Sequence, residues 1–156
     1  MNDNQPVTSQ RFRMLSVVTS GWILLLILAG AIVRVTGSEL GCPDWPFCAG
    51  QTLPAWISLG HRLIAGAALL LSITLAGLAW RDYRSQRLIL WPALLAAGLA
   101  GGQALLGAVS VWFDNPYLAV ISHLLVALAY FSSTLFLATA AHLPAETVRQ
   151  AGITNP

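Results

Sequence analysis

Two histidines, His61 and His123, are the residues of this sequence whose type and position best suit the binding of a metal or a cofactor. Each lies a few residues into a long apolar run, and both runs are expected to enter a membrane from the same side. At about 1.5 Å of helix rise per residue, the two imidazoles then lie at similar depth. Imidazoles at one level on two different helices can bind a haem iron from opposite sides. The spacing therefore predicts a haem between these helices.

Other interpretations of the histidines stay open at this point. Each imidazole could instead hydrogen-bond a neighbouring helix, as polar side chains do inside membrane bundles. A zinc site would need more ligands, and no third histidine or cysteine lies at that level in the helices. His142 follows His123 by about 19 residues, close to the thickness of the hydrocarbon core. We therefore expect His142 to be an interfacial residue without a role.

Four apolar runs must position the histidines, and each satisfies the length of about 20 residues that a membrane-spanning helix needs. We expect helices at 15–33, 57–80, 88–113 and 117–141. The predicted fold class is all-α, a four-helix transmembrane bundle over residues 15–143 between polar tails at 1–14 and 144–156. The first run is longer than the apolar part of a cleavable leader, about 7 to 15 residues, so we expect it to remain as a helix.

Composition excludes several classes of protein. Of the 156 residues, 56% are hydrophobic and 9% charged, whereas an ordinary soluble domain carries about 25% charged residues. The eight basic residues are all arginines, and they are scattered singly or in short flanks. Because no basic stripe exists that could follow a phosphate backbone, we expect no nucleic-acid partner. The partners expected from composition are membrane lipids.

The arginines also predict the orientation in the membrane. Six of them flank the runs on one side, at Arg11, Arg13, Arg81, Arg84, Arg87 and Arg149. Cytoplasmic segments carry an excess of arginine, so both termini are expected in the cytoplasm. The connections at 34–56 and 114–116 hold one arginine and three acidic residues, and they are expected outside. The sequence thus predicts a multi-pass protein of a prokaryotic-type cytoplasmic membrane.

Three polar residues near the predicted haem are candidate ligand contacts. Arg34 and Arg62 lie near the outer boundary, where their guanidinium groups can pair with the two propionates of a haem or extend to the lipid headgroups. Gln103 lies in the middle of the third run, where its amide needs a partner. That partner is either a neighbouring helix or a substituent of the ligand.

Cys42 and Cys48 are the only two cysteines, and both lie in the connection expected outside. An oxidising exterior permits a disulfide between them. Their spacing does not match a paired zinc motif, and two cysteines alone cannot complete a structural zinc site. A structural or redox-exchanging disulfide is the favoured interpretation, with free thiols as the alternative.

Short similar stretches at 30–33 (GAIV) and 107–111 (GAVSV) form a weak internal repeat. Each is followed by an outside connection and then by a run with an early histidine. The chain is therefore interpreted as two helix pairs in the same orientation, with chance similarity as the alternative.

Four segments resemble the haem A synthase family. They are GAIVRVTGSELGCPDWPFCAG at 30–50, HRLIAG at 61–66, QALLGAVSV at 103–111 and HLL at 123–125. Family members typically have eight helices in two similar halves, each half with a histidine pair. They oxidise the methyl group of haem O to the formyl group of haem A for terminal oxidase assembly. This chain resembles one half of such a protein.

The resemblance implies roles for four residues. His61 and His123 are expected to bind haem iron, and Cys42 and Cys48 to be the cysteine pair of the first outside loop. The implied cofactors are haem B as a bound cofactor and haem O and haem A as substrate and product. A homo-oligomer or a second half-size subunit is expected to supply a second site. Haem O synthase and a thiol-disulfide protein are candidate further partners.

The sequence departs from the family pattern at two positions. The family usually places a glutamate three residues before the first histidine, where this chain has Ser58. Glu39 stands where a small residue is expected and is a candidate source of a catalytic carboxylate. The expected function is an oxidoreductase of the haem A synthase type. The alternatives are a non-catalytic bis-histidine subunit that binds or transfers haem, and a structural subunit without a cofactor.

Overall fold

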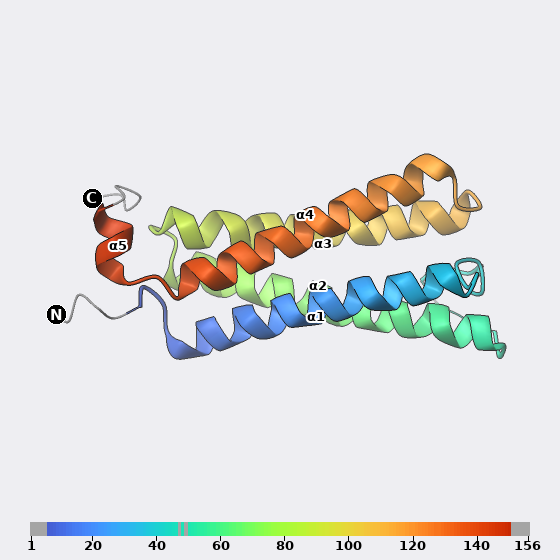
Figure 1. The fold of residues 1–156 in the computed structure, drawn as a ribbon, viewed down its shortest axis with the longest axis horizontal. Coiled ribbons are helices and arrows are strands. Elements are labelled where there is room, and N and C mark those ends of the chain that lie inside the picture. The colour runs from blue at the N-terminus through green and yellow to red at the C-terminus, as the bar shows by residue number, and fades with distance from the viewer. Residues whose placement is uncertain (1–5, 47, 49, 151–156) are drawn as a thin grey trace.

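Four long helices and one short helix make up most of the described chain. The computed structural model describes residues 6–46, 48 and 50–150. The helices are α1 (Gln10–Val35), α2 (Leu53–Asp82), α3 (Arg87–Trp112), α4 (Tyr117–Ala141) and α5 (Ala145–Gln150) (Figure 1). The first four are long and apolar enough to cross a membrane. The predicted all-α four-helix bundle is therefore confirmed.

Two helices begin earlier than the apolar runs indicated, because polar caps lie upstream of those runs. The Ser9 side chain accepts a hydrogen bond from the backbone N–H of Phe12, so α1 begins at Gln10 rather than at residue 15. The Thr52 side chain likewise accepts from Ala55, and α2 begins at Leu53 rather than at residue 57. The polar tail expected at 144–156 contains the short helix α5. Residues 151–156 lie outside the described chain.

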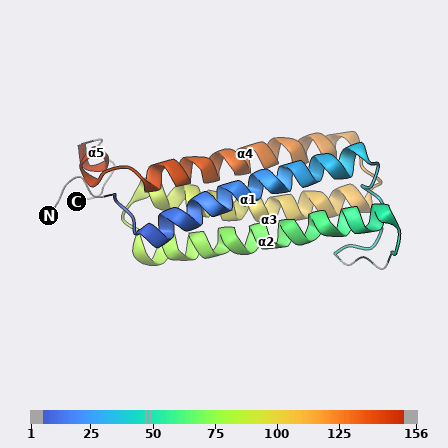
Figure 2. The ribbon, with the colours of Figure 1, turned by 60° about the horizontal axis from the view of Figure 1, so that its bottom comes forward.

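The four long helices form a ring in which each packs against two neighbours. The contacting pairs are α1 with α2, α2 with α3, α3 with α4, and α4 with α1. The helices on each diagonal, α2 with α4 and α1 with α3, have no described Cα atoms within 8 Å of each other. Figure 2 shows the four helices along one long axis. The two helices that carry His61 and His123 therefore face each other across the centre of the bundle.

The apolar interior fills only part of the length of the bundle. We call the end that carries residues 36–52 the loop end. One buried cluster lies toward the opposite end and includes Phe12, Leu75, Ile89 and Leu137. A second cluster lies near the middle and includes Ile23, Ala68 and Tyr130. Neither cluster contains a residue from the turns of α2 and α4 that carry the two histidines.

Both described chain ends lie at the end of the bundle opposite the loop end (Figure 1). The Thr8 hydroxyl donates to the carbonyl of Ala141 at 2.8 Å, and the N–H of Val7 donates to the carbonyl of Leu143 at 3.1 Å. These bonds hold the segment before α1 against the end of α4. The prediction that both ends share one side of a membrane agrees with this arrangement, and its assignment to the cytoplasm stays a prediction.

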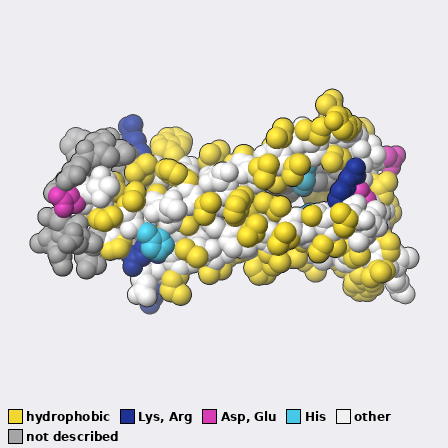
Figure 3. Space-filling view, in the orientation of Figure 1, with side chains coloured by type: hydrophobic (Ala, Val, Ile, Leu, Met, Phe, Trp, Pro, Cys, Tyr) yellow, Lys and Arg dark blue, Asp and Glu magenta, His cyan; other side chains and the backbone are white. Residues whose placement is uncertain are grey.

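The outer surface of the bundle is apolar along its length. Figure 3 shows hydrophobic side chains over the middle of the molecule and charged side chains near its two ends. Large exposed side chains on the four helices include Leu28, Leu70, Leu95 and Leu128. Such a continuous apolar surface is unsuited to water and matches the hydrocarbon of a bilayer.

Candidate haem site

His61 and His123 lie at nearly the same level on the two diagonal helices. His61 follows the first residue of α2 by eight positions, and His123 follows the first residue of α4 by six. Since both helices begin at the loop end, this difference corresponds to about 3 Å of helix rise. The structure therefore brings the two predicted ligands to one region.

Neither imidazole has a hydrogen-bond partner among the described residues. The Nδ1 atoms of His61 and His123 are both buried and unpaired. Hydrogen bonds from the rings to neighbouring helices, the alternative left open by the sequence, are not found in the described chain. A buried polar atom without a partner costs about 1–3 kcal/mol and calls for an explanation such as a bound group.

A glycine on the preceding helix lies beside each histidine ring. A Cβ atom added to Gly30 of α1 would lie 3.2 Å from Cε1 of His61. A Cβ atom added to Gly107 of α3 would lie 3.7 Å from Cε1 of His123. Both glycines belong to the short stretches that form the internal repeat. The repeat thus corresponds to equivalent contacts in the two helix pairs, each with a glycine against a histidine.

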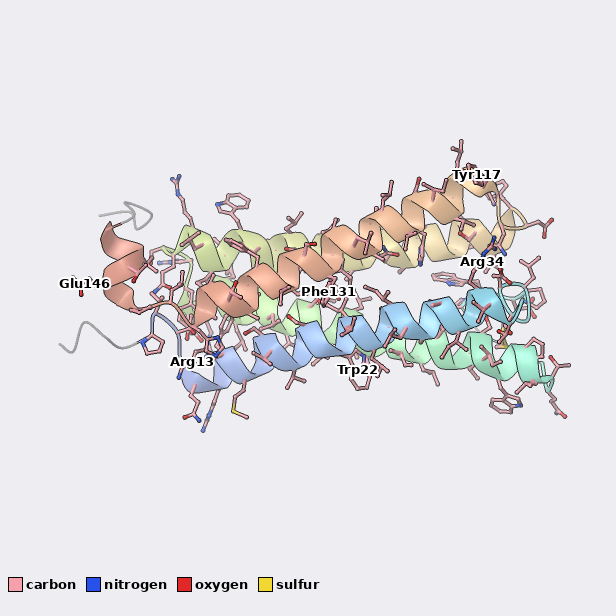
Figure 4. All side chains as sticks on the ribbon, viewed as in Figure 1. Arg13, Trp22, Arg34, Tyr117, Phe131 and Glu146 are labelled. Carbon is pink, nitrogen blue, oxygen red and sulfur yellow. A yellow bond between two sulfur atoms is a disulfide. The ribbon has the colours of Figure 1, made fainter. Side chains whose placement is uncertain are left out.

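The space between the helix pairs is open near the histidines. Figure 3 shows a hollow there, with histidine atoms inside and arginine atoms at its rim. Figure 4, in the same orientation, labels Arg34 at this position, extending from the end of α1 between the two helix pairs. No group of three or more His, Cys, Asp or Glu side chains that could hold a metal ion occurs in the described residues. Two opposed imidazoles fit a haem iron, whose other ligands come from the porphyrin, better than a zinc ion.

The loop before α2 is closed by the expected disulfide between Cys42 and Cys48, whose Cα atoms are 5.1 Å apart. Cys42 is fully buried, and its sulfur lies 3.2 Å from the carbonyl oxygen of Ala55 in the first turn of α2. A Cβ atom on Gly41 would lie 2.6 Å from the backbone of Pro54. Only a glycine allows this close approach, so the loop packs directly on the start of α2.

Arg62, the residue after His61, holds the same loop. Its guanidinium donates to the carbonyl of Asp44 at 2.6 Å, to that of Cys42 at 2.6 Å and to that of Pro46 at 3.4 Å. The disulfide loop is thereby fixed to the helical turn that carries a candidate iron ligand. Contact between Arg62 and a propionate stays a prediction, and the described partners of its guanidinium are loop carbonyls.

Arg34 and Glu39 form an ion pair at the loop end, with 2.6 Å between Nη1 and Oε1. The side chain of Arg34 is 63% exposed, whereas that of Glu39 is 21% exposed. The pair joins the end of α1 to the loop. The expected roles, a propionate contact for Arg34 and a catalytic carboxylate for Glu39, remain predictions.

Three further residues singled out in the sequence have clear positions. The Gln103 amide donates to the backbone carbonyl of His123 at 2.8 Å, so Gln103 joins α3 to the turn that carries the histidine. Ser58 is 5% exposed on α2. A ring nitrogen of His142 lies 2.7 Å from the carbonyl of Ala138, one turn earlier on the same helix. His142 is at the opposite end of α4 from His123.

Sequence reasoning missed Tyr130, a hydrogen-bonded residue that lies farther from the loop end than the two histidines. Tyr130 is 2% exposed, and its hydroxyl bonds Ser72 and the Ala68 carbonyl on α2. Tyr130 follows His123 by seven residues, and Ala68 follows His61 by seven, which are spacings of about two helical turns. The spacing places each pair on one face of its helix, but no pattern within either helix shows that Tyr130 reaches Ala68.

These features define a membrane four-helix bundle with a pair of unpaired histidines on diagonal helices. The model of a family described as cytochrome oxidase assembly protein, COX15-CtaA, matches residues 13–56 and 55–154. Because these matches cover most of the chain, the protein belongs to this family. It is an integral membrane protein.

The chain is also similar to curated relatives named heme A synthase. Those from Bacillus cereus strain AH187, Bacillus anthracis strain CDC 684 and Bacillus thuringiensis subsp. konkukian strain 97-27 are each 37% identical over 137 residues. The aligned region covers 82% of this chain and 44% of each relative. The chain therefore spans less than half the length of these relatives.

Replacing Arg62 by alanine should release the disulfide loop from α2. Loss of these charge-assisted hydrogen bonds should lower the free energy of loop opening by about 1.4 kcal/mol, which corresponds to about tenfold faster amide hydrogen exchange. Exchange of the backbone amides at 41–46, followed by mass spectrometry, measures this change. The matched control is Arg34→Ala, which removes one exposed ion pair. Equal protection of the loop in Arg62→Ala and the unsubstituted protein would contradict the assignment.

Proposed function

We propose that this protein binds haem between α2 and α4, with His61 and His123 as the two axial ligands of the iron. The observation that supports this most strongly is the pair of half-buried imidazoles, at one level on diagonal helices, whose buried Nδ1 atoms have no partner among the described residues. A bound iron would take one ring nitrogen of each imidazole as its ligand. Gln103 would hold the backbone at His123 in place.

The propionates of the proposed haem would face the loop end. Arg34 is the basic residue that extends between the helix pairs there (Figure 4). Its exposed guanidinium is paired with Glu39, and a propionate can replace or share that partner. This orientation leaves the apolar edge of the macrocycle toward the middle of the bundle. In the same proposal the loop end faces outside and both termini face the cytoplasm.

We further propose that the protein acts as a haem A synthase, which oxidises the methyl group of haem O to the formyl group of haem A for terminal oxidase assembly. Membership of the cytochrome oxidase assembly family and similarity to relatives named heme A synthase support this activity. The substrate macrocycle carries the reacting methyl group. The protein would hold the iron and orient the ring.

The second haem site expected for this activity remains part of the proposal. The described chain contains one unpaired histidine pair, whereas the relatives are more than twice as long as the region they share with it. A second copy of this chain or a separate half-size subunit would supply another pair. Haem O synthase and a thiol-disulfide protein would be the partners that deliver the substrate and exchange electrons with Cys42 and Cys48.

A non-catalytic haem-binding or haem-transfer subunit is the second candidate function. Ser58 supports it, because this buried position holds a hydroxyl where the family resemblance leads us to expect a glutamate. A serine hydroxyl is a poor general base at neutral pH, since it has no negative charge to accept a proton. Under this candidate the haem would be bound and released unchanged.

Replacing either iron ligand should abolish the bis-histidine absorption spectrum of the haem-loaded protein. His61→Ala and His123→Ala each remove one axial ligand, so the iron should become five-coordinate or be lost. His142→Ala is the matched control, because its ring bonds its own helix at the other end of the bundle. Visible absorption of the purified reduced and oxidised proteins measures the effect. A wild-type spectrum in His61→Ala or His123→Ala would refute the ligand assignment.

Coexpression with a source of haem O should separate the two candidate functions. If the protein is an enzyme, haem extracted from it should include haem A or a hydroxylated precursor, as identified by chromatography and mass spectrometry. Ser58→Glu should then increase the oxidised fraction, because it restores a carboxylate near His61. Recovery of haem O alone from both proteins would favour the binding or transfer function.

A further inference from the structure

Tyr130 makes the only hydrogen bonds between α2 and α4 in the part of the chain that the structure describes. Its hydroxyl oxygen lies 2.6 Å from the hydroxyl oxygen of Ser72 and 3.1 Å from the carbonyl oxygen of Ala68. The two helices are diagonal partners without Cα atoms within 8 Å of each other. One tyrosine side chain from α4 therefore crosses the centre of the bundle and ends on α2.

We call these hydrogen bonds of Tyr130 to Ser72 and Ala68 the Tyr130 bridge. The bridge lies on the side of the two histidines away from the loop end. Seven residues separate His123 from Tyr130 on α4, and seven separate His61 from Ala68 on α2. Seven residues make nearly two full turns, so each pair shares one face of its helix, with about 10.5 Å of rise between its members. Figure 4 labels Phe131, the neighbour of Tyr130, and Trp22 near the middle of the bundle. The bridge thus joins α2 and α4 about two turns away from the imidazoles, on the side away from the loop end.

Neighbouring side chains pack around the Tyr130 bridge and hold it in place. Tyr130 packs in the buried middle cluster with Ile23, Ala68 and Ala96. Trp22 of α1 fixes the same stretch of α2, because its indole N–H donates to the carbonyl of Ile64 at 3.0 Å. A hydrogen bond in such an apolar interior is not weakened by competing water. The separation of α2 from α4 is therefore held at this level by a side chain of fixed length.

We propose that the Tyr130 bridge sets the separation of α2 and α4, and through it the distance between the imidazoles of His61 and His123. The proposal rests on the proposed function in that those imidazoles hold the haem iron. Tyr130 is a positioning residue, since it acts through the two helices that carry the ligands. Without its hydroxyl bonds the two helices can move apart or together, and the distance between the two imidazoles is no longer fixed.

Tyr130→Phe is a clean test because it keeps the ring and removes only the hydroxyl. The chain should still fold, since Ser72 lies four residues after Ala68 and its hydroxyl can turn to the Ala68 carbonyl on its own helix. Ser133→Ala is the matched control. It removes a hydroxyl that donates at 3.0 Å from α4 to the Pro92 carbonyl of α3, a neighbouring helix rather than the diagonal one.

The experiment uses the full chain in lipid nanodiscs, with spin labels on cysteines introduced at Leu63 and Leu124. Both side chains are exposed on the outer surface, beside the turns that carry the histidines. Pulsed electron paramagnetic resonance gives the distance between the labels, and titration with haem B gives the affinity and the low-spin fraction. We expect Tyr130→Phe to shift or broaden the distance distribution and to weaken haem B binding about 10-fold to 100-fold. Ser133→Ala should change neither quantity.

Three outcomes decide the proposal. Distances and haem B affinity in Tyr130→Phe equal to those of the unsubstituted protein would overturn it. Equal changes in Ser133→Ala and Tyr130→Phe would also overturn it, because general loosening would then explain the effect. If the unsubstituted protein binds no haem B, the proposed function fails, and the label distances alone decide whether the bridge sets the helix separation. Should Tyr130→Phe not fold, Ser72→Ala provides the second variant, with a smaller shift expected.

Discussion

Two half-buried imidazoles, whose buried Nδ1 atoms have no hydrogen-bond partner among the described residues, lie on helices that face each other across the bundle, and the candidate site depends on them. Lipid cannot satisfy the Nδ1 atoms of His61 and His123, and no described residue does so. Each unpaired atom costs about 1–3 kcal/mol in the absence of a ligand. Such a cost calls for a bound group at this level, and a haem iron is a group that imidazoles on two facing helices can hold.

The parts of the bundle around the histidines serve to place them. Gly30 leaves room for the ring of His61, Gly107 lies beside the ring of His123, and Gln103 holds the backbone at His123. Arg62 ties the disulfide loop to the turn that carries His61. Apolar clusters fill the bundle below the histidines, whereas the level of the histidines is left without such a cluster. The bundle is thus packed with buried apolar side chains on the side of the candidate site away from the loop end, and it has no such cluster at the site itself.

Much of this arrangement could be predicted from the sequence, because hydropathy and histidine depth depend on local spacing alone. The four spans, the shared level of His61 and His123 and the disulfide between Cys42 and Cys48 agree with those expectations. The early starts of α1 and α2 were missed because polar capping residues precede the apolar runs. The loop contacts of Arg62 and the bridge of Tyr130 could not be predicted, since they depend on which helices become neighbours and which become diagonal partners. That choice is made by packing, and no pattern within one helix encodes it.

The most direct test of the central claim is near-infrared magnetic circular dichroism of the haem-loaded protein, purified in its oxidised state. The energy of the porphyrin-to-iron charge-transfer band identifies the two axial ligands of a low-spin haem. The account predicts the band of bis-histidine coordination, from one haem for each chain. A high-spin five-coordinate spectrum, or the band of any other ligand pair, would contradict the claim that His61 and His123 hold the iron together.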